Sequence, residues 1–89
     1  MSIRGILRAT IDITGGLNLT GSPNVFINGY PVVRVGDLVA GYSHHGSGVM
    51  ATGSPTFFVN GIPVCRVGDT STNGGVGRQG SLPFNVFTN

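Results

Sequence analysis

Short apolar runs on either side of an Asn-Gly dipeptide set the pattern of the chain. One run ends at Ile27 and the next begins at Tyr30, and the same arrangement recurs around residues 60–61. Asn-Gly is the strongest two-residue signal for a β-hairpin, because both central residues of a type I′ turn need a positive φ. The pattern therefore predicts two hairpins, in which Ile27 pairs with Tyr30 and Val59 pairs with Ile62.

Both faces of these predicted hairpins are apolar. Side chains alternate across a strand, so Phe57 and Val59 share one face of the second hairpin, whereas Phe58 and Cys65 share the other. A hairpin that is apolar on both faces must be covered on both. We expect the cover to come from sibling hairpins and neighbouring strands, or from a partner protein.

The hairpins belong to a longer repeat. Residues 20–37 return 32 residues later with 13 of 18 positions identical. A third lead-in begins at Gly75, and the first-strand sequence then recurs in part up to Asn89. Copies this short cannot bury a hydrophobic face alone, so they must share one core. We expect one domain, residues 1–89, with approximate threefold symmetry and repeat units at 16–37, 48–69 and, incomplete, 75–89.

Composition favours strands and turns over helices. The chain has 16 glycines, and each costs about 1 kcal/mol relative to alanine inside a helix. A chain of 89 residues buries only roughly 60 to 65% of its unfolded surface. Charged residues make up only 9%, against about 25% in an ordinary domain. We therefore expect an all-β domain whose apolar surface is covered by another protein.

The charges are scattered and opposite in sign. The net charge is +2, from five arginines and three aspartates. Nucleic-acid binding needs clustered cations on one face, so the pattern argues against it. Arg34 and Arg66 are expected to pair with Asp37 and Asp69, because a guanidinium fork suits two carboxylate oxygens. Asp12 would occupy the matching turn before the first lead-in.

The chain shows no sign of insertion or export through a hydrophobic segment. No apolar run reaches the roughly 18 residues that a membrane span requires. Arg4 and Arg8 interrupt the first residues before any signal-peptide core can form. The single cysteine, Cys65, excludes an internal disulfide.

The repeated motif at residues 31–34 and 63–66 points to a known family. Pro-Val-Val-Arg and Pro-Val-Cys-Arg resemble the Pro-Ala-Ala-Arg tetrapeptide of the PAAR-repeat proteins. The ordered set Gly-Ser-Pro, Asn-Gly, Pro-x-x-Arg and Val-Gly-Asp covers the chain from about Asp12 onward. The resemblance implies a small conical, pseudo-threefold domain of β-hairpins.

The resemblance also implies a structural function. Such a protein caps and sharpens the end of a trimeric β-helical puncturing spike, with one chain per trimer, and touches the target cell envelope only transiently. The expected setting is the tip of the central spike in a phage tail baseplate, and hence the virion. The alternative is a type VI secretion spike tip, secreted without a signal peptide, that serves as an adaptor for a separately encoded effector.

A metal site near the apex is a further expectation from the resemblance. Family members commonly hold a structural zinc, and here the candidate ligands are His44, His45 and Cys65, with iron as an alternative metal. A fourth ligand would come from water, Asp or the backbone. The chain departs from the family pattern, since Thr14 stands where the family often has a histidine. The alternative is that Cys65 is a small core residue, replacing Val33 of the first copy, and that the histidines lie on an exposed loop.

Catalytic chemistry is not expected. Residues 75–80 match the dinucleotide-binding fingerprint in letters, but Pro83 prevents the helix that must follow it. Cys65 and a histidine could serve as nucleophile and base, yet no oxyanion donor or orienting group is identifiable. The sequence therefore predicts no catalytic residue and no small-molecule substrate. A small zinc-stabilised enzyme or sensor domain is the third hypothesis.

Overall fold

The regular structure of the chain is all β, as predicted. The computed structural model describes residues 4–78 and 87–88. These residues form strands and turns without a helix, so they contain no helix that could cross a membrane. The strands are β1 (Arg4–Gly5), β2 (Ile13–Thr14), β3 (Gly16–Leu17), β4 (Phe26–Ile27), β5 (Tyr30–Pro31), β6 (Leu38–Val39), β7 (Gly48–Val49), β8 (Phe58–Val59), β9 (Ile62–Pro63), β10 (Gly77–Arg78) and β11 (Phe87–Thr88).

The two predicted hairpins form in the predicted register. In β4–β5, Ile27 pairs with Tyr30, and in β8–β9, Val59 pairs with Ile62. The turn residues have the positive φ that a type I′ turn demands, 53° and 84° in the first hairpin (Asn28-Gly29) and 55° and 75° in the second. The Asn-Gly dipeptides therefore fix both register and turn type.

A third antiparallel strand pair, which no turn connects but which we count below as the third hairpin, is formed by β1 and β11. Strand β1 pairs with β11, with Arg4 opposite Thr88 and Gly5 opposite Phe87. The N-terminal segment thus supplies the second strand that unit 75–89 lacks, and Gly5 stands at the register position of Pro31. In the sequence this segment matches no repeat unit, because it has neither the proline nor the Asn-Gly turn.

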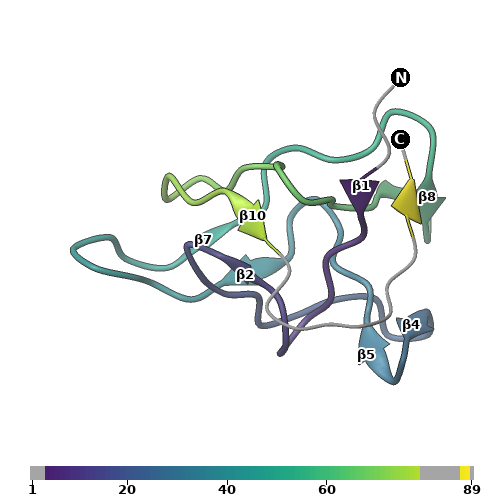
Figure 1. Ribbon diagram of the computed structural model, residues 1–89, viewed down its shortest axis with the longest axis horizontal. Coiled ribbons are helices and arrows are strands. Elements are labelled where there is room, and N and C mark those ends of the chain that lie inside the picture. The colour runs from purple at the N-terminus through teal and green to yellow at the C-terminus, as the bar shows by residue number, and fades with distance from the viewer. Residues whose placement is uncertain (1–3, 79–86, 89) are drawn as a thin grey trace.

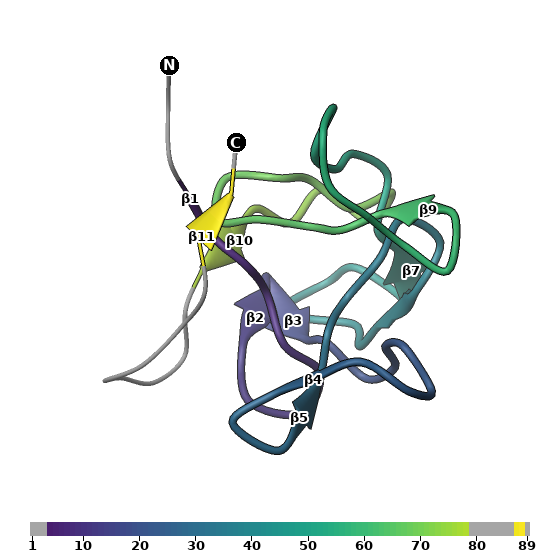
Figure 2. The same cartoon turned by 90° about the vertical axis from the view of Figure 1, so that its right-hand side faces the viewer.

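The three hairpins lie around one end of the molecule. Figure 2 looks onto this end, with β1–β11 on the left, β4–β5 below and β9 on the right. Figure 1 shows that three connections lie at the other end of the long axis. We call the end formed by β1–β11, β4–β5 and β8–β9 the hairpin end. We call the opposite end of the long axis, formed by residues 13–16, 40–47 and 72–75, the apical end.

A closed ring of backbone hydrogen bonds links the repeats between these ends. The amide of Val33 donates to Leu7 O at 3.0 Å, that of Cys65 to Val33 O at 2.8 Å, and that of Leu7 to Cys65 O at 2.9 Å. Each repeat therefore bonds to the next, and the last bonds back to the first. The ring shows that these three segments surround a common axis.

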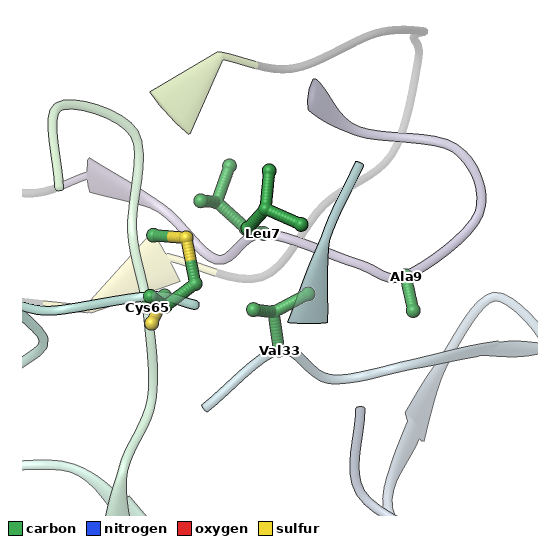
Figure 3. Packing of buried hydrophobic residues seen from close by; sticks show 6 residues of the cluster. Leu7, Ala9, Val33 and Cys65 are labelled. Atoms are coloured by element: carbon green, nitrogen blue, oxygen red, sulfur yellow. The ribbon is translucent and has the colours of Figure 1, made fainter. Parts of the chain in front are cut away.

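The core consists of two layers of small apolar side chains. The layer around the ring contains Leu7, Ala9, Val33, Val39, Met50 and Cys65. Figure 3 shows Leu7, Val33 and Cys65 reaching this layer from separate segments of the chain. The second layer lies under the hairpins and contains Ile6, Val32, Val59 and Val64. In the second hairpin, Val59 and Cys65 are buried although they lie on opposite faces, whereas Phe57 and Phe58 stay exposed.

Candidate functional site

The outer face of the hairpin end carries exposed aromatic side chains. Phe26 and Phe58 occupy equivalent positions in β4 and β8, and each is 52% exposed. Val25 and Phe57 precede them and are also exposed. Register places Phe87 at the third equivalent position, opposite Gly5. Large apolar side chains left in solvent at one end of a small domain indicate a protein-binding surface. The recurrence of Phe at one position in each copy was the sequence signal for it.

Asn60 ties neighbouring hairpins together at this end. Its side-chain oxygen accepts hydrogen bonds from Ser22 Oγ at 2.9 Å and from Arg34 Nη1 at 3.1 Å. Its Nδ2 donates to Asn24 Oδ1 at 3.1 Å. The turn of one hairpin is thereby held against the segment that leads into another. From the sequence, Asn60 was predicted only as a turn residue, and this contact was not predicted.

An Arg–Asp pair closes each repeat. Asp69 Oδ2 accepts from the backbone amide of Arg66 at 2.7 Å and from its Nε at 2.9 Å. Arg34 and Asp37 form the same pair, which confirms the prediction. Arg8 and Asp12 form the third one, with Nε 3.0 Å from Oδ2 and side chains only 3% and 0% exposed. The carboxylates therefore act as structural clamps on the backbone.

The pairing lowers the pKa of Asp69. Burial alone would raise the pKa of this carboxyl, but hydrogen bonds from the side chain and backbone of Arg66 and from Thr52 outweigh it. The hydrogen bond to Asp69 in turn raises the pKa of Arg66. Both groups therefore stay charged across the physiological range.

Cys65 is a buried core residue. Its side chain is fully buried, and Sγ donates to the carbonyl oxygen of Thr52 at 3.3 Å. Burial raises the pKa of the thiol strongly, and the negative charges of Asp69 and Asp37 raise it further. A metal ligand must be a thiolate, so this environment favours the opposite state. The position matches the alternative in which cysteine replaces the equivalent Val33.

The two histidines lie in an exposed turn at the apical end. Tyr42 and His45 exchange backbone hydrogen bonds across this turn at 3.1 and 2.8 Å, and Ser43 takes a φ of 52°. The His45 ring stacks on Tyr42 with centroids 4.9 Å apart. His44 lies at the tip of the turn and is exposed.

The donor set does not fit a closed zinc site. All histidines, cysteines and acidic residues of the chain lie between residues 12 and 69, within the described part. No three of these side chains gather where they could hold a metal ion. A structural zinc needs four donors, whereas the aspartates are engaged by arginines and Cys65 lies in the core. The zinc site of His44, His45 and Cys65 stays a prediction from the sequence, because the structure does not bring its ligands together.

The hollow beside the apical end holds no pair of catalytic groups. It is open, has a volume of about 380 Å³ and is lined by Ile13, Gly15, Tyr42, Gly74, Gly75, Val76 and Arg78. None of these residues is a histidine, cysteine or carboxylate, so the hollow has no nucleophile with an adjacent base.

Comparison with known proteins agrees with the repeat architecture. Residues 11–76 match the PAAR motif family, and no curated protein matches the chain. The matched region spans both complete motifs, the first Arg–Asp turn from Asp12 and the whole apical end. Proteins of this family cap trimeric spikes, and they often bind zinc. The chain therefore belongs to the PAAR motif family, whose members are structural, non-enzymatic spike tips of contractile injection machines.

Proposed function

We propose that this protein caps the blunt end of one trimeric β-helical spike, with its hairpin end as the docking surface and its apical end pointing away. The observation that carries the proposal is the arrangement of three hairpins around one end, with Phe26 and Phe58 equally exposed at matching positions. A single chain with internal threefold pseudo-symmetry can match the end of a true trimer without a symmetry mismatch.

The hairpins supply two kinds of contact for such a partner. Exposed phenylalanines near the centre of an interface contribute much of its binding free energy. Each hairpin is also a two-stranded sheet, so its outer strand edge is available to continue a strand of the spike. Together these contacts would cover the apolar surface and the open edges that the isolated chain exposes.

Co-expression with a trimeric β-helical spike protein from the same genome tests the proposal. Native mass spectrometry is expected to show one chain per spike trimer. The variant Phe26→Asp/Phe58→Asp should remain folded and lose the complex, because each substitution places a charge in the interface. Leu38→Asp is the matched control, since Leu38 is 42% exposed and lies on β6, outside the hairpins. A complex with one chain per spike subunit, or one that survives the double substitution, would refute the assignment.

For the setting, we propose the central spike of a phage tail baseplate, with a type VI secretion spike as the alternative. The scattered charges and exposed apolar end suit a buried position on either machine. Mass spectrometry of purified virions is expected to detect this chain at one copy per tail. Its appearance instead in the culture supernatant, dependent on secretion-sheath proteins, would place it on a secretion spike.

A further inference from the structure

The lead-in glycines allow very close backbone contacts at the apical end. A Cβ added to Gly75 would lie 2.0 Å from Thr14 O, and one added to Gly16 would lie 2.1 Å from Ala40 O. At Gly48, the third lead-in glycine, a Cβ would lie 2.7 Å from Thr72 Oγ1. Each lead-in therefore packs directly on the connection of another repeat, and the apical end has no room for a ligand-filled gap at these contacts.

Tyr42 and Asn73 link the apical connections through side chains. The Tyr42 ring covers Gly15, where an added Cβ would lie 2.4 Å from Cε1, and its hydroxyl donates to Asn73 O at 3.3 Å. Asn73 Nδ2 donates to Gly46 O at 2.9 Å and also approaches Ala40 O at 3.4 Å. These contacts join residues 13–16, 40–47 and 72–75 to one another.

Thr14 and Asn18 form a buried polar pair at the connection of residues 13–16. Thr14 Oγ1 donates to Asn18 Oδ1 at 3.0 Å, and Asn18 Nδ2 donates to Asp12 O at 3.0 Å. Thr14 and Asn18 are fully buried. No described buried side-chain polar atom lacks a hydrogen-bond partner, so these groups are satisfied within the protein and do not need a ligand.

We propose that hydrogen bonds and the Tyr42 ring hold the apical end of this chain in its folded form, without a metal ion. The contacts described in the three paragraphs above occupy the connections that a metal would otherwise join. The six potential metal ligands of the chain, three aspartates, two histidines and one cysteine, are exposed, buried in the core or paired with arginine. Tyr42 and Asn73 thus take the cross-linking role that ligand bonds have in small metal-stabilised domains.

Metal content and thermal unfolding of the full-length chain provide the first test. We expect less than about 0.1 metal ion per chain by elemental analysis. Added EDTA, or one equivalent of zinc, should shift the Tm by less than about 1 °C, because an ion that does not bind the native state cannot stabilise it. Stoichiometric metal, or a fall in Tm of more than about 5 °C in chelator, would overturn the proposal.

The second test removes the cross-link itself. Asn73→Ala should lower the Tm by about 4–8 °C and speed amide exchange in residues 41–48. His44→Ala is the matched control, because it removes a predicted metal ligand from the same connection and should leave both readouts unchanged. Slow apical exchange in Asn73→Ala, or a large Tm loss in His44→Ala, would contradict the proposal. Both substitutions lie at the apical end and both readouts are taken on the isolated chain, so the test is independent of spike binding at the hairpin end.

Discussion

Glycine is the residue type that sets how closely the repeats approach. Gly16, Gly48 and Gly75 begin the three lead-ins, and at each one a side chain would meet the connection of another repeat. Gly75 and Gly16 are more restrictive than Gly48, because the obstructing atoms belong to the backbone, of Thr14 and of Ala40, and cannot rotate away. The recurrence of glycine at one position of every unit thus reports a packing requirement as well as a turn.

We predict that Gly75→Ala destabilises the protein by at least about 2 kcal/mol, since the added methyl group forces backbone atoms apart. Gly46→Ala is the control, because nothing lies within 4 Å of a Cβ at that position, and it should change the unfolding free energy by less than about 0.5 kcal/mol. Urea denaturation followed by circular dichroism measures both. Equal effects at the two glycines would show that the close approach at Gly75 does not matter.

Individual site residues were predictable only where their role is local. The partners of Arg34 and Arg66 lie three residues away, so spacing revealed them. The environment of Cys65 depends on segments distant in sequence, and the residue types of Cys65 and His45 alone suggested metal ligands. The exposure of Phe26 was not predictable, because both faces of its hairpin read as apolar. Which face meets the core is decided by the other two repeats.

At the level of elements, the Arg–Asp turn is the unit that ends each hairpin strand. In the two complete copies the Arg and Asp lie three positions apart, and a glycine takes positive φ, 91° at Gly36 and 93° at Gly68. In the N-terminal segment Arg8 and Asp12 lie four positions apart, and Thr10 takes a φ of 67°. The sequence placed Asp12 in this turn, but the extra residue and the missing glycine hid Arg8 as its partner, although the carboxylate makes the same contacts.

The pKa of Asp69 predicts a loss of stability in acid. Its folded-state pKa lies below the ordinary value of 3.8, so its contribution is complete above the unfolded pKa and is lost as the pH falls through the folded pKa. Asp69→Asn should lower the unfolding free energy at pH 7 by roughly 3 kcal/mol, because Arg66 loses its buried partner. The unfolding free energy of the variant should also depend less on pH below about 4 than that of the parent. Denaturant titrations at a series of pH values measure both effects.

Arg4→Ala is the companion variant for this series. Arg4 Nη1 lies 3.9 Å from Asp69 Oδ1, and its side chain is 38% exposed. An ion pair of this kind contributes less than about 1 kcal/mol, so the acid transition of Arg4→Ala should match that of the parent. An unchanged acid transition in Asp69→Asn would show that other groups control the pH dependence.

For the whole molecule, the main feature that the sequence did not reveal is the third repeat, whose two strands, β1 and β11, come from opposite ends of the chain. We call it the split repeat. Two complete copies and an incomplete third predicted threefold pseudo-symmetry, and the all-β class followed from glycine content and turn signals. The pairing of β1 with β11 was hidden because the segment from Gly5 to Arg8 keeps only the arginine of the motif. Pairing between strands that are distant in sequence leaves only a weak sequence signal when no hairpin turn connects them.

The split repeat predicts that the chain tolerates circular permutation. In the permutant, residues 89 and 1 are joined through a short Gly-rich linker, and the chain is opened between Asn28 and Gly29. This change only moves the chain break to an equivalent, exposed turn. The permutant should unfold cooperatively, with a free energy within about 2 kcal/mol of the parent. A permutant opened between Val33 and Arg34, inside the hydrogen-bonded ring, should not fold. Failure of the first permutant, or folding of the second, would contradict this view of the molecule.

The closed ring also limits how the gene can change. An open repeat array grows by duplication, because a new unit stacks on the last one and exposes the same surface as before. Here Leu7, Val33 and Cys65 already bond to one another in a circle, and a fourth unit would find neither donor nor acceptor without opening it. We therefore expect in-frame duplication of one unit to disrupt the fold, whereas a change in the length of a turn or connection leaves the ring closed.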